Sequence, residues 1–398
     1  MSEQLQIAIV GGGIGGLTAA LALRARGLHV TVFEQAGGLR EIGAGVSIHP
    51  NAALLLQRVG LIDGIKQIGS AITGLFVRTS LGEPISTSAL TSTGVQGYNV
   101  HRAEFLKLLI DAQPRGTLHF NHRLSAARET QGHVRLSFSN GETVDTDIVI
   151  GADGIHSALQ REIGLKTSAS SEGIMAYRGL IPTGRLSWTK NIDGAMSMWI
   201  GKGRSFLCYP VSGGRLMNMV AFVPTNFDSE ESWTAPGDLN ALGAEYAGWD
   251  DPVLETIGAL DQTFRWGIYD RAPLPYWSTS RMTLLGDAAH PMVPHLGQGA
   301  AQAIEDGFTL AVLLEGAKCT DVPRRLKAYE KLRIERTSRI QAVARDAGRF
   351  YRAEYENTSE RDRLMGKWLS AAGWIRGHDA EQAAEEAVLL AGNDAAMQ

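Results

Sequence analysis

The stretch Leu5–Glu34, LQIAIVGGGIGGLTAALALRARGLHVTVFE, contains the strongest structural signal in the sequence. It begins with a short apolar run, Leu5–Val10, which leads into a cluster of glycines. Apolar residues then recur at helical spacing over Leu17–Arg26, and a β-branched run, His29–Phe33, follows Gly27. Strand, tight turn, helix and second strand in this order predict a βαβ unit with parallel strands.

The glycines of this turn have the spacing G-x-G-x-x-G, which is typical of dinucleotide binding. Gly11 permits the tight turn, Gly13 lets the backbone approach a pyrophosphate, and Gly16 allows the helix to pack closely on the strand. Free amide groups at the helix start suit phosphates, while Glu34 can accept hydrogen bonds from ribose hydroxyls and disfavours a 2′-phosphate. The unit therefore predicts binding of FAD or NAD; the alternative is a turn with only a packing role. The cofactor-binding residues expected here are Gly11, Gly13, Ile14, Gly15, Gly16, Glu34 and Gln35.

The composition indicates a globular protein and excludes several classes. The chain has 398 residues, of which 44% are hydrophobic and 20% charged, with a net charge of -4. This balance rules out disorder, and we expect no binding to nucleic acid or to a membrane. Two cysteines, Cys208 and Cys319, exclude a disulfide framework and a CxxC centre, so we expect a cytoplasmic location. The length predicts about two to three domains.

Outside the βαβ unit, the sequence predicts a mixture of strands and helices. Alternating segments at Thr73–Ser80, His133–Phe138 and Thr143–Ile150 indicate strands, and Glu41–Pro50 is typical of a glycine-rich loop. Short strands separated by turn residues over Gly173–Pro224 predict a mostly antiparallel sheet. The helices expected further along the chain are Ala300–Leu314, Val322–Tyr351 and Arg361–Leu390.

A second glycine turn occurs near the far end of the chain, in RMTLLGDAAHPMVPHLGQGA at Arg281–Ala300. A predicted strand ends in Gly286-Asp287, and Gly297-Gln298-Gly299 then opens a helix. This stretch resembles the GD motif of the group A flavoprotein aromatic hydroxylases. The resemblance implies that Asp287 binds the ribityl chain of FAD and that the helix start faces the flavin pyrimidine. The alternative is an ordinary strand, turn and helix with an aspartate cap.

Two further segments agree with that family. Asp147–Ser157, DIVIGADGIHS, is similar to its DG motif, although this chain has Gln160 where the family usually places an arginine. Tyr98–Leu106, YNVHRAEFL, resembles its His-Arg-x-x-x-Leu segment, in which Arg102 is the implied partner of FAD oxygens. The resemblance implies these further cofactor-binding residues: Gly45, Val46, Arg102, Leu124, Asp153, Asp287, Gln298, Gly299 and Ala300.

The match to this family extends from Ile7 to about Arg339 and is closest to the salicylate hydroxylase-like branch. It implies an α/β fold in which a Rossmann-like FAD-binding domain is interleaved with a mixed-sheet substrate domain and closed by C-terminal helices. The FAD-binding domain would comprise residues 1–70, 98–172 and 280–350, the substrate-binding sheet 71–97 and 173–279, and the helical tail 351–398. No second G-x-G-x-x-G occurs in the sequence, which favours transient docking of NADH or NADPH.

The implied activity is that of a single-component FAD monooxygenase. NADH or NADPH would reduce the flavin, O2 would form a C4a-hydroperoxide, and a phenolic or aminoaromatic carboxylate would be hydroxylated, with or without the decarboxylation of salicylate hydroxylase. Two alternatives stay open: a flavin hydroxylase of a pyridine, purine, quinolone or polyketide phenol, and a non-catalytic flavoprotein that binds an aromatic ligand. We expect a monomer or homodimer, and no metal, since the sequence has no HExxH.

Ring hydroxylation needs an electron-rich ring, commonly obtained by removing a phenol proton, so the site needs a base. Relatives of this branch often carry a histidine before a Tyr-Pro pair, where this chain has Ser205 in GRSFLCYP, Gly203–Pro210. Ser205 would relay a proton to water, unless the substrate ionises without help or is already activated by an amino group. His295 in the second glycine turn is the other candidate acid or base, with a structural role as its alternative. The expected substrate-binding residues are Ser47, Tyr209, Pro294 and His295.

Several of these side chains have a structural alternative. Ser47 would otherwise bond its own loop backbone, and Tyr209 would otherwise pack in the core. His290 resembles a residue that holds the second glycine turn together. Four methionines alternate along predicted strands and belong either to the floor of an apolar pocket or to the core: Met196, Met198, Met217 and Met219.

Overall fold

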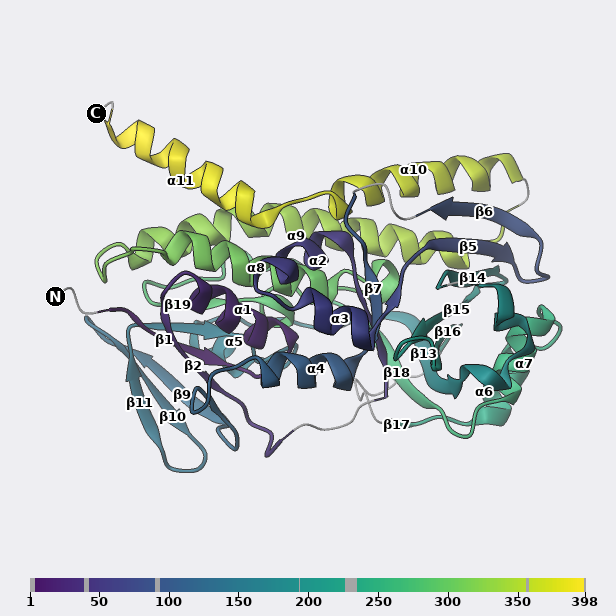
Figure 1. The fold of residues 1–398 in the computed structure, drawn as a ribbon, viewed down its shortest axis with the longest axis horizontal. Helices are drawn as coiled ribbons and strands as arrows, with labels where there is room; N and C mark the ends of the chain where they lie inside the picture. The colour runs from purple at the N-terminus through teal and green to yellow at the C-terminus, as the bar shows by residue number, and fades with distance from the viewer. Residues whose placement is uncertain are drawn as a thin grey trace.

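The protein, described here by a computed structural model of residues 4–38, 43–89, 94–192, 194–225, 235–355 and 358–396, contains a parallel sheet at one end (Figure 1). The strand order is β19 (Met282–Leu284), β12 (Ile148–Gly151), β1 (Gln6–Val10), β2 (His29–Phe33) and β8 (Leu118–His119). The pairings of β1 with β12 and with β2 are both parallel. The predicted βαβ unit is thus confirmed.

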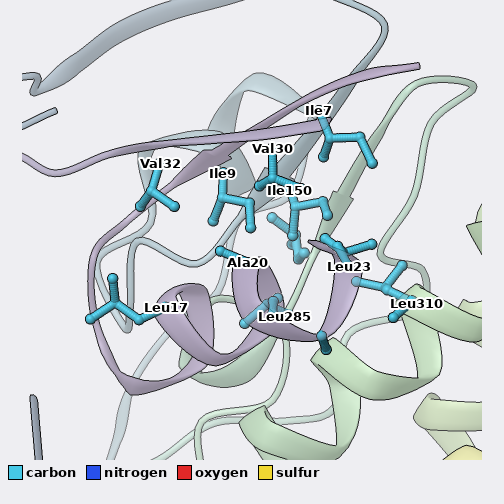
Figure 2. Packing of buried hydrophobic residues seen from close by; sticks show 14 of the residues in the cluster. Ile7, Ile9, Leu17, Ala20, Leu23, Val30, Val32, Ile150, Leu285 and Leu310 are labelled. Atoms are coloured by element: carbon cyan, nitrogen blue, oxygen red, sulfur yellow. The ribbon is translucent and has the colours of Figure 1, made fainter. Parts of the chain in front are cut away.

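Two helices, α1 (Ile14–Ala25) and α8 (Gly299–Leu314), pack against each other beside this sheet. Figure 2 shows strand residues such as Ile9 and Ile150 above Ala20 of α1, with Leu310 of α8 in the same cluster. Four of the five β1 residues are buried, which explains its apolar sequence. Because β1 and β19 run parallel to β12, the glycine turns that follow them lie at the same edge of the sheet.

A small antiparallel sheet contains only the first part of one strand that the sequence predicts. It consists of β9 (Leu124–Glu129), β10 (Val134–Phe138) and β11 (Thr143–Thr146). The single strand expected over Thr143–Ile150 is therefore wrong, because β11 ends before Asp147 and β12 belongs to the parallel sheet. The backbone N–H of Asp147 donates to the Gln6 carbonyl, and its carboxylate accepts from the Gln6 N–H at 2.8 Å. These two bonds direct the chain from one sheet into the other.

The other half of the molecule is an eight-stranded mixed sheet, as expected. All its pairings are antiparallel except that of β14 with β5. One face is covered by α6 (Leu239–Glu245) and α7 (Asp251–Gly258). The strands follow the order β17 (Ala235–Pro236), β18 (Phe264–Asp270), β13 (Ser170–Pro182), β16 (Leu216–Pro224), β15 (Arg204–Val211), β14 (Met196–Gly201), β5 (Gly74–Thr79) and β6 (Pro84–Ala89).

Between the two large sheets lies a three-stranded sheet of β3 (Gly45–Ile48), β7 (Tyr98–His101) and β4 (Ser70–Ala71). The loop expected over Glu41–Pro50 thus contains a strand, because β3 pairs with β7 along its whole length. Shorter helical segments complete this part of the fold: α2 (Pro50–Arg58), α3 (Ile62–Ile68), α4 (Arg102–Asp111), α5 (Ala158–Glu162), and the 3-10 turns η1 (Thr183–Arg185), η2 (Ser187–Asn191), η3 (Gly286–Ala288) and η4 (Pro294–Leu296).

Three helices form the C-terminal part: α9 (Val322–Arg352), α10 (Thr358–Arg376) and α11 (Ala380–Ala396). The continuous helix expected over Arg361–Leu390 is broken, because the Asp379 carboxylate accepts from the backbone N–H groups of Glu381 and Gln382 and so starts a new helix. In Figure 1, α9 runs along the molecule beside α8 and α10. The described helices include none with the length and apolar character of a membrane span.

Candidate active site

The glycines of the first turn are of two kinds. Two of them are required by close packing of the backbone, and one borders empty space. A Cβ on Gly11 would lie 2.2 Å from the Ala152 carbonyl oxygen, and one on Gly16 would lie 2.0 Å from the Gly11 carbonyl oxygen. Gly11 also has φ of +114°, which favours glycine. A Cβ on Gly13, in contrast, would meet no protein atom within 4 Å. The open space at Gly13 is therefore available to a ligand.

The residues around this turn offer both kinds of group that a dinucleotide needs: N–H donors for its phosphates and a carboxylate acceptor for its ribose hydroxyls. No side chain caps the start of α1, so its amide groups stay available. The Glu34 carboxylate accepts from the backbone N–H groups of Gly12 at 2.6 Å and Ala36 at 2.7 Å, which fixes it at the end of β2. A Cβ on Gly15 would lie 2.8 Å from Leu285, so this glycine brings α1 close to the second turn. Gln35 is exposed, and Ile14 is the first residue of α1.

Buried polar side chains hold the second glycine turn in place. The Asp306 carboxylate accepts from the Gly286 N–H at 2.8 Å and contacts the Nε2 atom of His290 at 2.6 Å. Gln160, at the position where the resemblance leads one to expect an arginine, donates to the Ala288 carbonyl at 3.0 Å. The structure thus gives His290 the expected role of holding the turn together, and Gln160 connects the DG segment to the GD turn.

Asp287 belongs to this second turn and lines a cavity. Its side chain is solvent-accessible because it opens onto a cavity, yet the surrounding protein is dense enough that desolvation raises its pKa. Burial lowers the pKa of Arg102 at the start of α4, while Asp287 and Glu34 act in the opposite direction. Arg102 therefore interacts electrostatically with Glu34, which contacts the first turn, and with Asp287 of the second turn. The open Gly13, the uncapped α1, Glu34, Arg102 and Asp287 therefore fit one extended FAD molecule.

Three predicted cofactor residues make contacts within the protein. The Asp153 carboxylate accepts from the Ser157 hydroxyl at 2.5 Å and from the Ala158 N–H at 2.6 Å, so it caps α5. Leu124 is buried in the core at the start of β9. Gln298 accepts from the Asn51 amide and does not line the cavity. Contact of these three residues with FAD stays a prediction.

A cavity of about 310 Å³ extends from Asp287 to the inner face of the eight-stranded sheet. Alternation along the strands decides which methionines reach it: Met196 and Met198 line the cavity, whereas Met217 and Met219 lie in the core under α6 and α7. The predicted site residues that line it are Gly45, Val46, Ser47, Tyr209, Asp287, Pro294, His295, Gly299 and Ala300.

Two of the predicted substrate residues, Ser47 of β3 and Tyr209 of β15, lie where these two strands approach each other. The Ser47 hydroxyl donates to the Asn99 side-chain oxygen at 2.7 Å, so it does not bond its own loop backbone. The Gly45 N–H donates to the Asn218 side chain at 2.8 Å, and a Cβ on Gly45 would lie 2.5 Å from the Tyr209 ring. Burial raises the pKa of Tyr209, which therefore keeps its proton. This corner of the cavity is polar but uncharged.

His295 lines the same cavity and is neutral. Burial, with a contribution from Arg352, lowers its pKa to about 3. Arg352 donates to the Nε2 atom of His295 at 3.2 Å, so the ring proton must lie on Nδ1. No described group accepts a hydrogen bond from Nδ1. We therefore propose that His295 acts as a hydrogen-bond donor.

We expect the pH profile of substrate-stimulated NADH oxidation to be parallel in wild type and His295→Gln between pH 5 and 8. The reason is that a histidine with a pKa of about 3 does not change its charge in that window. The measurement is kcat at constant ionic strength. An inflection near pH 6 to 7 that is present in wild type and absent from the variant would contradict the neutral assignment.

Ser205, the second predicted catalytic residue, does not line the cavity. It is fully buried opposite Phe222 in β16, and its hydroxyl has no partner among the described groups. Its role as a proton relay stays a prediction without a geometric argument in its favour. Sequence reasoning missed several cavity residues, among them His49, Arg178, Trp368 and Arg376. His49 lies within the glycine-rich loop expected over Glu41–Pro50, but no local pattern marks the other three.

Comparisons with known proteins show the family of this chain. A family model described as an FAD binding domain matches residues 4–347. The 3-amino-4-hydroxybenzoate 2-monooxygenase PtmB3 of Streptomyces platensis is 35% identical over 94% of this chain and 96% of its own length. The 6-hydroxynicotinate 3-monooxygenase of Bordetella bronchiseptica is 36% identical over 87% and 92%. A salicylate hydroxylase substrate complex superposes with a TM-score of 0.84 and 28% identity, covering 96% of this chain and 97% of that one.

The fold and the site thus define an FAD-dependent oxidoreductase. The chain belongs to the salicylate hydroxylase-like family of FAD-dependent aromatic monooxygenases.

Proposed function

We propose that the protein hydroxylates an aromatic ring that bears a carboxylate together with a hydroxyl or amino group, using NADH or NADPH and O2. The observation that carries the proposal is the cavity, which joins Asp287 and Gly299 at the cofactor end to the apolar wall of Met198 and Leu207. A flat ring on that wall would lie beside the cofactor. The names of both relatives described above specify a hydroxylated aromatic acid as substrate.

The reaction balances as a monooxygenation. A ring C–H becomes C–OH with one oxygen atom of O2, the other oxygen leaves as water, and NAD(P)H supplies the two electrons. Bound FAD supplies the oxygen-activating chemistry at its C4a position. Whether the ring also loses its carboxylate, as in salicylate hydroxylase, depends on the position of attack.

The charges on the cavity wall suit an ionised substrate without a strong protein base. The charged side chains among its described lining residues are Arg178, Asp287 and Arg376, and His49 and His295 are both neutral because their pKa values are lowered to about 3. Two cations against one anion favour the ionised form of a bound phenol and lower its pKa. This arrangement supports the alternative in which the substrate ionises without Ser205.

We expect at least one of 3-amino-4-hydroxybenzoate, 6-hydroxynicotinate and salicylate to accelerate NADH or NADPH oxidation by the FAD-loaded protein. The product formed under ¹⁸O2 should contain one labelled oxygen, measured by mass spectrometry. Oxidation at the basal rate with all three acids would contradict the proposal. Acceleration without labelled product would favour the non-catalytic flavoprotein, and turnover restricted to uncharged phenols would favour another substrate class.

A further inference from the structure

Arg376 is the last residue of α10 and lines the cavity. It acts on the pKa of His49 and of Tyr351. The other two charged side chains among the described lining residues are Asp287, in the second glycine turn, and Arg178, in β13. Arg376 is thus the charged group that α10 brings to the cavity.

No carboxylate of the described residues pairs with Arg376. Burial lowers its pKa, and Tyr351 is the only group that opposes this effect. Burial raises the pKa of Tyr351, so that hydroxyl stays neutral and cannot serve as a counter-ion. The neighbouring Arg336 and Arg352 do have acidic partners, Glu305 and Glu172. A largely buried guanidinium without an anion is costly, so an anionic ligand would be stabilised there.

Part of the cavity wall is apolar and aromatic. Leu75 and Met196 line the cavity from the sheet, while Tyr351 and Trp368 line it from α9 and α10. These four residues belong to one hydrophobic cluster. A ligand that suits both this wall and Arg376 has a flat apolar body and one anionic group.

The final turn of α10 is held in place from α9. Arg336 donates to the carbonyl of Ile375 at 3.0 Å and to the buried Glu305 carboxylate at 2.7 Å. The guanidinium of Arg339 lies 4.3 Å from the centre of the Trp374 ring. Arg376 follows these two anchored residues directly. Its backbone is therefore ordered before a ligand binds, which reduces the entropic cost of binding.

We propose that Arg376 binds the carboxylate of the aromatic substrate through charge-assisted hydrogen bonds, so that α10 determines the substrate class. The inference rests on the proposed function in taking the ligand to be an aromatic acid. Arg178 is the other cation among the described lining residues, but its guanidinium already lies over the rings of Trp266, at 5.5 Å, and Phe264, at 5.8 Å. The carboxylate is therefore assigned to Arg376, which has no acidic partner among the described residues.

The test compares acids with their carboxamides in FAD-loaded protein. Dissociation constants of salicylate and salicylamide, and of 3-amino-4-hydroxybenzoate and its carboxamide, are measured from the change in flavin absorption. We expect Arg376→Met to weaken acid binding by about 10- to 100-fold and carboxamide binding by no more than about threefold. Arg376→Lys should retain part of the preference for the acid. Arg363→Met, which removes an exposed arginine of the same helix, should behave as wild type.

Three results would overturn the assignment: unchanged acid binding in Arg376→Met, an equal loss for acid and carboxamide, or no acid binding by wild type. Because the readout is binding and not turnover, the two proposals can fail separately. If binding of an acid depends on Arg376 but the acid is not hydroxylated, the proposed function is contradicted and the role of Arg376 in binding the carboxylate still holds.

Discussion

Arg333→Met is expected to lower the free energy of unfolding by about 3–5 kcal/mol, since it leaves buried carboxylates without their partner. Arg333 is 2% exposed and donates to Asp306 at 2.7 Å and to Glu305 at 2.5 Å. Asp306 also holds Gly286 and His290, so the same change would loosen the second glycine turn. Urea denaturation of the FAD-free and FAD-bound protein measures both effects. The matched control is Arg349→Met on the same helix, whose exposed pair with Asp346 contributes no more than about 0.5 kcal/mol.

The pH dependence of stability provides an independent check on this network. Burial raises the pKa of Glu305, but Arg333 and Arg336 outweigh it and lower that pKa from 4.5 to about 2. A carboxylate with a lowered pKa stabilises the folded state above pH 4.5, and this stabilisation is lost as the pH falls toward 2. Wild type should therefore lose stability across that window more steeply than Arg333→Met. Equal slopes, or a small effect at neutral pH, would show that the buried ions contribute little.

Gly16→Ala and Gly13→Ala are expected to fail in different ways, although both change a glycine of the same turn. A Cβ at Gly16 would lie 2.0 Å from the carbonyl oxygen of Gly11, so the backbone must move. We expect Gly16→Ala to destabilise the FAD-free protein by about 1–3 kcal/mol. A Cβ at Gly13 meets no protein atom within 4 Å, and its φ of -78° suits alanine. The FAD-free stability of Gly13→Ala should then stay within about 0.5 kcal/mol of wild type.

The same pair separates packing from ligand approach. If the pyrophosphate lies against Gly13, the added methyl group should weaken FAD binding by about 10- to 100-fold. FAD affinity is measured by titration of the FAD-free protein with fluorescence detection. Gly13→Ala protein that binds FAD as tightly as wild type would contradict the placement of the cofactor at this turn. A destabilised Gly13→Ala would show that its role, too, is packing.

The sequence predicted the parts of the site that lie close together along the chain. The turn glycines, Glu34 and the GD turn with Asp287 are recognisable because glycine spacing and strand–turn–helix order are local properties. The strand alternation also predicted that Met196 and Met198 share one face of the sheet, opposite to the face of the residues next to them in the strand. It could not tell which face of the sheet would border the cavity, because that depends on where α6 and α7 pack.

The tertiary structure alone decided which distant side chains share the cavity. Ser205 was placed in the site by its position before Tyr209, yet Phe222 and not Ser205 borders the cavity. Arg376 is more than a hundred residues from any strand of the cavity wall, and α10 brings it there because Arg336 of α9, itself paired with Glu305 of α8, donates to the Ile375 carbonyl of α10. Motif spacing thus predicted a dinucleotide, because a phosphate-binding turn is formed by residues close together in the sequence, and the resemblance of the GD turn specified FAD. The substrate-binding part of the cavity is formed by buried ion pairs and helix packing between segments that are distant in the sequence. Local sequence patterns do not predict such contacts.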